Sequence, residues 1–255
     1  MYSNDLLDVS DKHILITGAS SGIGKATALM LSRLGAVLTI TGRDSNRLAQ
    51  TFESLCGHGH NMFVSDLSNE ISCTELIKLA INTSGPLNGL VHCAGLHKTL
   101  PIKSLRESDF DDIFNANVRS SFFLAKAIRS KGNYVPQSTS LIFLSSAAAS
   151  CGQAAISTYS SSKSALEGMC RSLSVEFSKV GIRVNCIAPG IIETEMVGGL
   201  KKQLSEAQYE DIVRSHPLGI GNQNDVSHSV VFLLSSLSTW ITGTVLHVDG
   251  GYTAK

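Results

Sequence analysis

Short apolar runs rich in β-branched residues alternate along this chain with longer segments in which apolar residues recur at the helical period. Strands are expected at about 13–17, 36–41, 61–65, 88–93, 139–145, 182–188 and 244–248. Helices are expected at about 22–34, 45–55, 70–83, 109–131, 157–179 and 224–236. Strand and helix alternating over the whole length predict an α/β fold, a parallel sheet with helices on both faces.

Composition narrows the class of protein. The chain has 255 residues, of which 43% are hydrophobic and 16% charged, as in a globular domain with a sizeable core. Its formal net charge is zero, which argues against a nucleic-acid binder. No apolar run approaches the ~18 residues of a membrane span, and the acidic start lacks the basic residues of a secretory signal. The six cysteines form no C-x-x-C pair, so we expect reduced thiols, no metal site and a cytoplasmic location.

A glycine-rich turn follows the first expected strand and opens the first expected helix. Gly18, Gly22 and Gly24 are spaced G-x-x-x-G-x-G, which removes side chains where a phosphate must approach. The unpaired N–H groups of the helix N-terminus favour an anion at the same place. The alternative is a turn without function. We expect cofactor binding by the turn residues Gly18, Ser20, Ser21, Gly22, Ile23 and Gly24.

The end of the second strand indicates which dinucleotide binds. A carboxylate there would accept hydrogen bonds from the ribose 2′-hydroxyl of NAD, whereas an arginine would meet the 2′-phosphate of NADP. The chain has Gly42 and then Arg43, whose guanidinium suits a phosphate. Asp44 could pair with Arg43 or cap the next helix. The sequence favours NADP(H), with NAD(H) as the alternative.

Two further strand ends carry candidate cofactor contacts. Asp66 and Leu67 follow the third strand, where Asp66 could cap the next helix, accept a bond from an adenine amino group, or do both. Cys93, Ala94 and Gly95 end the fourth strand, and the small residues let the backbone come close to a flat ligand.

Tyr159 and Lys163 lie one helical turn apart on a single face of the expected helix 157–179. A tyrosine hydroxyl ionises near pH ~10, and an ammonium beside it favours the phenolate. The pair is therefore a workable device for proton transfer at neutral pH, although the same spacing also occurs by chance.

Taken together, these motifs resemble the short-chain dehydrogenase/reductase family, in its branch of roughly 250 residues. The matching signatures are Thr17 to Gly24, Ala94-Gly95, Asn117, Ser146, Tyr159-x-x-x-Lys163, Pro189-Gly190 with Thr194, and Val248-Asp249-Gly250-Gly251. The resemblance implies one NAD(P)-binding domain over residues 1–255, a Rossmann-type doubly wound parallel sheet of about seven strands. One departure is visible, because the family usually has Asn-Asn-Ala-Gly where this chain has His92-Cys93-Ala94-Gly95. We expect the lost amides to weaken hydrogen bonding near the adenosine half of the cofactor.

The resemblance also implies catalytic roles. Tyr159 matches the general acid and base, and Lys163 the lysine that lowers the Tyr pKa and holds the nicotinamide ribose. Ser146 matches the serine that orients the substrate oxygen, with Ser145 as the competing candidate on the opposite face of the strand. Asn117 matches the asparagine that positions a water in a proton relay, and its alternative is a solvated helix residue.

In the loop after the sixth strand, Pro189 fixes the turn and Gly190 permits close approach of a ligand. The resemblance implies that this loop holds the nicotinamide, with the Ile192 backbone and the Thr194 hydroxyl at the carboxamide. Residues 195–216 are then expected to form a mobile lid over the substrate, with Gly198-Gly199 as a hinge or simply a turn.

The expected activity is interconversion of a small-molecule carbonyl compound and a secondary alcohol. A 3-oxoacyl-(acyl-carrier-protein) reductase is the runner-up, because segments 134–140 and 178–181 contain a single lysine to meet an acidic carrier. A catalytically silent NADP-binding sensor is the alternative from another class. His97 and Lys98, at the expected pocket mouth, could suit a polar or anionic substrate.

The family resemblance also implies an oligomer, a homotetramer or homodimer paired through the helices 109–131 and 157–179. These helices carry the apolar residues Phe110, Phe114, Phe122, Leu166, Met169 and Leu173. The same side chains could instead face the sheet, so the sequence leaves both arrangements open.

Overall fold

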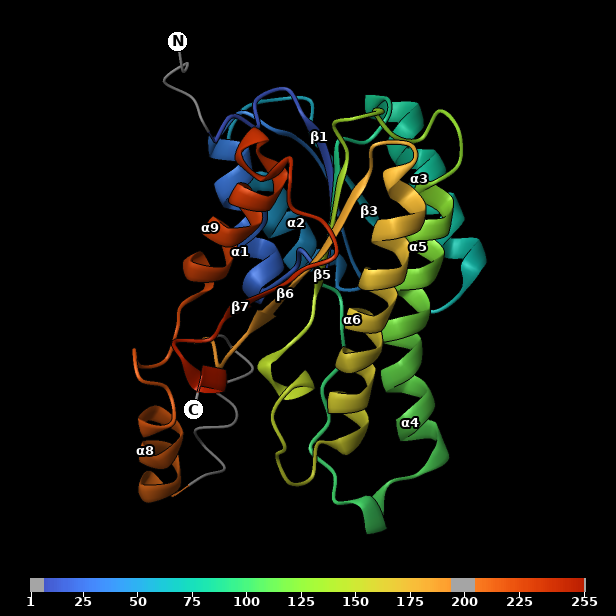
Figure 1. The fold of residues 1–255 in the computed structure, drawn as a ribbon. Coiled ribbons are helices and arrows are strands. Elements are labelled where there is room, and N and C mark those ends of the chain that lie inside the picture. Colours follow the sequence, from blue (N-terminus) through green and yellow to red (C-terminus); the bar gives the residue numbers. More distant parts are fainter. Residues whose placement is uncertain (1–6, 194–204, 255) are drawn as a thin grey trace.

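Within residues 7–193 and 205–254, which the computed structural model describes, seven parallel strands form one sheet in the order β3-β2-β1-β4-β5-β6-β7 (Figure 1). The strands are β1 (His13–Thr17), β2 (Val37–Gly42), β3 (Asn61–Val64), β4 (Gly89–His92), β5 (Ser140–Leu144), β6 (Arg183–Pro189) and β7 (Val245–Val248). The expected strands and the doubly wound α/β fold are confirmed, with strand ends displaced by at most one residue.

Strand order reverses between β1 and β4. From β1 the chain builds outward through β2 to β3, and it then returns to place β4 on the other side of β1. Both neighbours of β1 run parallel to it, with Thr17 opposite Thr41 on one side and His92 on the other. A crevice therefore opens beyond the carboxyl ends of β1 and β4, where ligands of such sheets bind.

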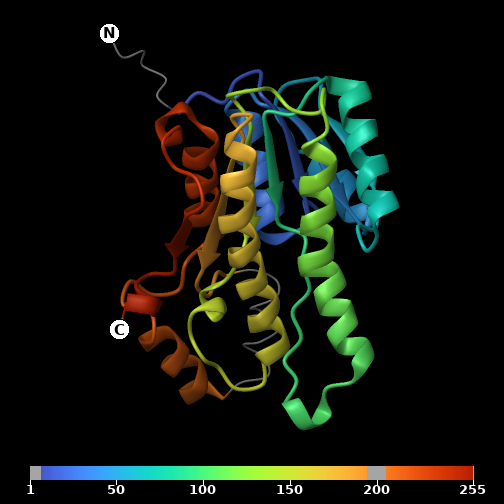
Figure 2. The same cartoon turned by 45° about the vertical axis from the view of Figure 1, so that its right-hand side comes forward.

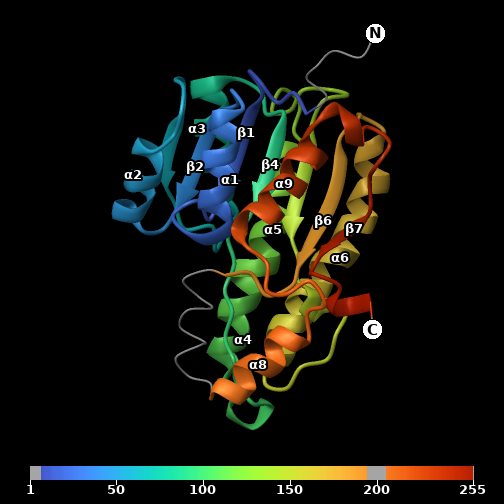
Figure 3. The ribbon, with the colours of Figure 1, turned by 90° about the vertical axis from the view of Figure 1, so that its left-hand side faces the viewer.

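Helices cover both faces of the sheet. One face carries α1 (Gly22–Arg33), α2 (Ser45–Glu53) and α9 (Gln223–Leu234), which lie in front in Figure 3. The other carries α3 (Glu70–Ser84), α4 (Glu107–Phe114), α5 (Ser120–Ile128) and α6 (Ser157–Ser178) (Figure 1). Alternate residues of each strand feed the two apolar layers: Ile14 and Ile16 pack on the α1 side, and Leu15 packs on the α6 side.

The expected helix 109–131 is interrupted. A π-helical turn, Asn115–Arg119, separates α4 from α5. At the start of α5, the Ser120 hydroxyl donates back to the Ala116 carbonyl of this turn at 2.6 Å, and the Ser121 hydroxyl donates to its Asn117 carbonyl at 2.7 Å. An extra residue in one turn changes the direction of the side chains that follow, and such turns are frequent at functional sites.

Several long helices reach past the sheet. Figure 2 shows α4 and the N-terminal turns of α6 extending beyond the carboxyl ends of the strands. A further helix, α8 (Glu206–Arg214), lies at the same end of the molecule, inside the segment expected to be a lid. Together α4, α6 and α8 border the space beyond the carboxyl ends of the strands. Among the described residues no helix is long and apolar enough to span a membrane.

Candidate active site

A single long cleft of about 1050 Å³ runs along the carboxyl ends of the strands. The turns that follow β1 to β6 line it, together with parts of α4, α6 and α8. The expected catalytic and cofactor residues line this cleft with two exceptions. Asn117 is fully buried and does not line it, and Thr194 lies outside the described residues.

The glycine turn after β1 has no room for side chains. Gly18 adopts φ +67°, and a Cβ there would stand 2.7 Å from the amide nitrogen of Ala94 at the end of β4. A Cβ on Gly24 would stand 2.3 Å from the Gly18 carbonyl oxygen. Ser21 begins α1 without a side-chain cap, and the first turn of α1 contains no acidic residue. The N–H groups of this helix end are thus left for an anion, which fits a cofactor phosphate.

The end of β2 leaves one arginine unengaged. Asp44 caps α2 by accepting from the Arg47 amide at 3.0 Å, and its other oxygen pairs with the Arg47 side chain at 2.9 Å. The alternative pairing of Asp44 with Arg43 is not formed. Arg43 lines the cleft and makes no ion pair with any residue in the described ranges. Its guanidinium is therefore available to a phosphate group.

Asp66 does not cap the helix that follows β3. That cap is Asn69, whose side chain accepts from the Ser72 amide at 3.0 Å. Asp66 instead accepts from the Ser68 amide at 3.2 Å and remains exposed at the cleft edge, while Leu67 is buried. The second carboxylate oxygen of Asp66 can still meet a ligand amino group.

His92, one of the residues that depart from the family pattern, forms two side-chain hydrogen bonds at the end of β4. Its Nδ1 lies 2.7 Å from the Thr17 hydroxyl, and its Nε2 lies 2.9 Å from the Ser120 hydroxyl. The Ser120 hydroxyl donates its proton to the Ala116 carbonyl at 2.6 Å, so it accepts from a ring proton on Nε2, and Nδ1 accepts from the Thr17 hydroxyl. The imidazole thus ties β4 to both β1 and α5, whereas the expected weakening near the adenosine half of the cofactor stays a prediction.

Ser146, and not Ser145, faces Tyr159. The Ser145 hydroxyl is buried and donates to Glu167 at 2.8 Å, on the far side of the strand end. Ser146 lies close enough to Tyr159 to lower the pKa of its hydroxyl, and this opposes the larger effect of burial, which raises that pKa. Strand alternation thus separates the two hydroxyls as expected.

Lys163 lies beneath Tyr159 on the same helix. Its Nζ is 5.6 Å from the centre of the Tyr159 ring and donates to the Leu144 carbonyl at 2.6 Å. Burial lowers the pKa of this ammonium to about 8. In this arrangement burial, rather than Lys163, has the larger effect on the pKa of Tyr159, and the expected lowering is not seen.

Asn117 is fully buried, so the alternative of a solvated helix residue is wrong. Its Oδ1 accepts from the Leu96 amide at 2.7 Å, and its Nδ2 donates to the Leu96 carbonyl at 3.0 Å and to Ser162 at 2.9 Å. The side-chain amide thus clamps the backbone that follows β4 against α6. The water-positioning role implied by the resemblance stays a prediction.

The loop after β6 is held by a histidine that sequence reasoning missed. The Ile191 amide donates to Nε2 of His216 at 3.2 Å, and Nδ1 of His216 donates to the Ile212 carbonyl at 2.9 Å. His216 is buried and stacks on Tyr252 with 4.7 Å between ring centres. The only sequence signal was its position at the end of the expected lid. Residues 194–204, with Thr194 and the expected Gly198-Gly199 hinge, lie outside the described residues.

Comparisons with known proteins agree with this geometry. A family model described as enoyl-(acyl carrier protein) reductase matches residues 18–253. The 3-oxoacyl-(acyl-carrier-protein) reductase FabG of Rickettsia prowazekii (strain Madrid E) is 36% identical over 96% of this chain and 98% of its own. The (2S)-((R)-hydroxy(phenyl)methyl)succinyl-CoA dehydrogenase subunit BbsD of Thauera aromatica is 32% identical with the same coverage.

A solved structure shows the same fold at full length. A short-chain type dehydrogenase/reductase from Mycobacterium ulcerans superimposes with a TM-score of 0.88 at 29% identity, covering 97% of this chain and 92% of that one. The chain belongs to the short-chain dehydrogenase/reductase family. It is therefore an oxidoreductase that acts on an alcohol or carbonyl group of a small molecule and uses a nicotinamide cofactor.

A short-chain dehydrogenase/reductase must hold a long dinucleotide, and the cleft suits one. It reaches from the uncapped end of α1 and Arg43 to Tyr159 and Lys163 without interruption. At the far end Gly190 packs on the last turn of the chain, since a Cβ there would lie 2.9 Å from the Cα of Asp249. The residues present thus fit phosphates at one end and a flat ring at the other.

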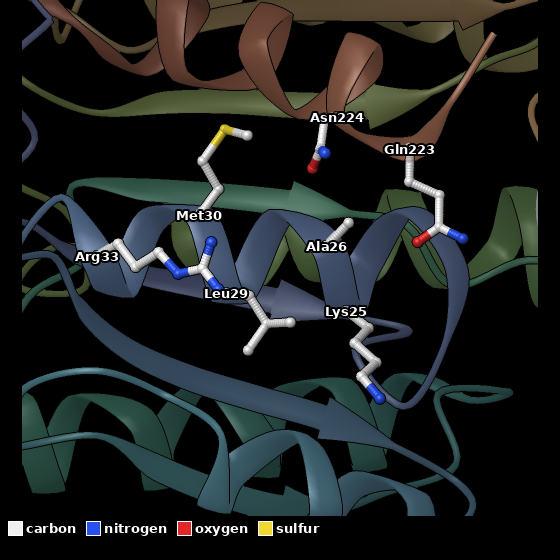
Figure 4. A pocket seen from close by; sticks show the side chains of 7 residues that line it. All are labelled: Lys25, Ala26, Leu29, Met30, Arg33, Gln223 and Asn224. Carbon is white, nitrogen blue, oxygen red and sulfur yellow. The ribbon is translucent and has the colours of Figure 1, made fainter.

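A second hollow of this protein, of about 310 Å³, lies between α1 and α9. Figure 4 shows Lys25 and Arg33 of α1 and Gln223 and Asn224 of α9 around a floor formed by Ala26, Leu29 and Met30. The surface lysine and arginine do not converge on one point (Figure 4). In the described ranges no cluster of three or more His, Cys, Asp or Glu side chains could hold a metal ion.

Proposed function

We propose that this protein is an NADP(H)-dependent reductase that interconverts a ketone and a secondary alcohol, with Tyr159 as general acid and base. The observation that carries the proposal is the cluster of Ser146, Tyr159 and Lys163 at one end of a cleft long enough for a dinucleotide. When bound, the nicotinamide supplies or accepts the hydride.

The residues of the chain supply placement and a proton. The hydroxyls of Ser146 and Tyr159 converge, so both can hold one substrate oxygen, and in reduction the Tyr159 hydroxyl gives that oxygen its proton. Burial raises the pKa of Tyr159, so the hydroxyl starts protonated, as an acid must. The Lys163 ammonium lies under the ring and stabilises the phenolate left after transfer.

The preference for NADP(H) is proposed from Arg43. It follows β2 directly, lines the cleft and is not held by Asp44, which pairs with Arg47 instead. An arginine is always charged at neutral pH and binds phosphate oxygens in pairs. NAD(H) has no 2′-phosphate and would leave this guanidinium without its ligand.

The test is turnover of NADPH with a panel of small ketones, diketones, keto-sugars, quinones and acetoacetyl thioesters. Tyr159→Phe is expected to lower kcat by about 100-fold or more while the dissociation constant of NADPH changes little. Tyr134→Phe is the matched control, because Tyr134 packs by Arg129 away from the cleft. Full activity of Tyr159→Phe would remove Tyr159 from the mechanism, and binding of NADPH without any turnover would favour a cofactor sensor.

A 3-oxoacyl thioester is the second candidate substrate. Relatives over the whole chain are named as 3-oxoacyl-(acyl-carrier-protein) reductases, and BbsD is named as a dehydrogenase of a CoA thioester. The panel separates the cases: a higher kcat/KM for acetoacetyl carrier protein than for acetoacetyl-CoA would favour a carrier-linked substrate. The reverse order would favour a free thioester or ketone.

Assembly through α4 to α6 remains a proposal. Leu166 and Met169 face the sheet and are buried, whereas Phe110 and Phe122 are 43% and 47% exposed on the outer faces of α4 and α5. Exposed aromatic side chains of this kind mark protein interfaces. A homotetramer or homodimer, a lid over about 195–216 and a cytoplasmic location all stay predictions from the sequence.

A further inference from the structure

His97 is the side chain that packs directly on the proposed catalytic tyrosine. The two ring centres are 4.5 Å apart and the rings are nearly perpendicular, at 80°. His97 lines the cleft, and it enters from the loop after β4, opposite the helix that carries Tyr159. A group in this position meets whatever is attached to the substrate carbonyl that Tyr159 and Ser146 hold.

The backbone on both sides of His97 is fixed. Before it, the Asn117 side chain binds the amide and the carbonyl of Leu96 at 2.7 and 3.0 Å. After it, the Leu100 amide donates to the Ala155 carbonyl at 2.6 Å, which joins the loop to the segment before α6. A side chain on a segment tied at both ends is held in place before a ligand arrives, which lowers the entropy cost of binding.

The nitrogens of His97 are open to the cleft. Neither makes a hydrogen bond with any residue in the described part of the chain, whereas every fully buried side-chain nitrogen and oxygen there has a partner. The His97 nitrogens therefore reach open space, and the space that this half-buried side chain lines is the cleft. They belong to a ring whose centre is 4.5 Å from that of Tyr159.

His97 offers hydrogen bonds and not charge. Burial lowers the pKa of the imidazole, and the nearby Lys163 ammonium lowers it further. A neutral imidazole presents one donor and one acceptor. Lys98 next to it adds no free cation, because its Nζ binds Asp109 at 2.9 Å and Asp112 at 2.8 Å. The pocket mouth thus suits an uncharged polar group better than an anion.

We propose that His97 is a specificity-determining residue that binds a second oxygen of the substrate, next to the carbonyl held by Ser146 and Tyr159. The preferred substrates are then compounds such as 3-oxoesters, in which a second carbonyl lies within a few bonds of the ketone. The inference rests on the proposed reductase function and names the substrate class of that same site.

The test compares two substrates with the same chain length. Ethyl acetoacetate has the second carbonyl, and methyl pentyl ketone lacks it. Wild type is expected to prefer the ester in kcat/KM, and His97→Phe, which keeps an aromatic ring against Tyr159, is expected to lower that preference by about tenfold, the worth of one hydrogen bond. His97→Gln, which retains a donor and an acceptor, is expected to keep part of it.

The control is His228→Phe, on an exposed turn of α9, which is expected to leave the preference unchanged. An equal loss for both substrates in His97→Phe would show that His97 only supports the Tyr159 ring and would overturn the proposal. So would the absence of any preference in wild type.

A binding measurement keeps this test separate from the proposed function. In the Tyr159→Phe background, calorimetry gives the dissociation constant of ethyl acetoacetate from the NADPH complex with and without His97→Phe. A rise of about tenfold that is absent for methyl pentyl ketone supports the contact, and equal constants overturn it. If wild type turns over neither compound, the reductase proposal fails for this class of ketone while the binding constants still decide the role of His97.

Discussion

Replacing His92 with asparagine should make the stability of this protein less sensitive to acid. His92 is 2% exposed and lies between the hydroxyls of Thr17 and Ser120. Burial, aided by the Lys163 ammonium, lowers the pKa of its imidazole from 6.5 to about 3. Below pH ~6.5 the unfolded chain therefore binds a proton at His92, whereas the folded chain keeps this imidazole neutral until the pH approaches about 3.

The sign and size of the effect follow from that difference. Because the unfolded state binds more protons, stability falls as the pH falls from about 6.5 toward about 3. With these two pKa values, the cost of keeping His92 neutral is about 0.2 kcal/mol near pH 7 and about 2 kcal/mol near pH 5. Asparagine does not titrate, so His92→Asn removes this dependence.

The same substitution costs stability at neutral pH. An asparagine side chain is too short to span both Thr17 and Ser120, so at least one hydrogen bond is lost, at about 1 kcal/mol, with a further cost for the smaller volume. Wild type is thus expected to be more stable than His92→Asn by about 1–2 kcal/mol near pH 7. Near pH 5 the two should be close to equal, because wild type loses about 2 kcal/mol that the variant does not.

Equilibrium unfolding in urea measures both differences, at one protein concentration and one ionic strength. His58→Asn, in the exposed loop after α2, is the control and should differ from wild type equally at the two pH values. The pKa is also lowered at His13, which is buried, and at His97, which is half-buried, but both are common to wild type and variant. A difference between wild type and His92→Asn that stays constant with pH would refute the reasoning.

Two further predictions concern the cofactor. Arg43→Ala should raise the dissociation constant of NADPH by about tenfold or more and that of NADH far less, by calorimetry, with the exposed Arg33→Ala as control; equal losses for the two cofactors would contradict the assignment. Gly24→Ala should weaken the binding of NADPH and NADH alike, because the alanine Cβ would stand 2.3 Å from the Gly18 carbonyl oxygen. Gly168→Ala is the control and should bind both cofactors normally, because the nearest atom to its Cβ is the end of the Arg171 side chain at 3.9 Å. Normal cofactor binding by Gly24→Ala would argue that the glycine turn after β1 is not fixed.

The sequence alone predicted the features that depend on neighbouring residues, namely the strands, the glycine turn and the shared face of Tyr159 and Lys163. Continuous apolar runs such as 13–17 belong to strands that are buried on both faces, and their regular alternation with helices indicated a parallel sheet. The glycine turn was predictable because steric exclusion depends on its own residues and spacing. The helical spacing of Tyr159 and Lys163 likewise fixed that they share a face.

The choices that the sequence left open depend on distances between side chains. Asp44 and Asp66 look alike as helix caps, yet Asp44 reaches the Arg47 amide, while the Asn69 side chain takes that place in α3. His216 was missed because the loop amide that it binds, Ile191, is distant in sequence and carries no pattern. The interruption of the helix 109–131 was hidden for a similar reason, since its apolar residues keep a helical period on both sides of the π turn.

His92 stands where the family usually has asparagine, and its contacts show which hydrogen bonds a side chain makes at this position. A residue there has to accept a hydrogen bond from Thr17 at the end of β1 and donate one to Ser120 at the start of α5. A neutral imidazole does both, whereas a protonated imidazole cannot, because it has no acceptor. The depressed pKa of His92 is therefore the condition under which histidine can serve at this position. Comparing residue identities alone counted two lost amides, whereas counting donors and acceptors shows that His92 makes one hydrogen bond to β1 and one to α5.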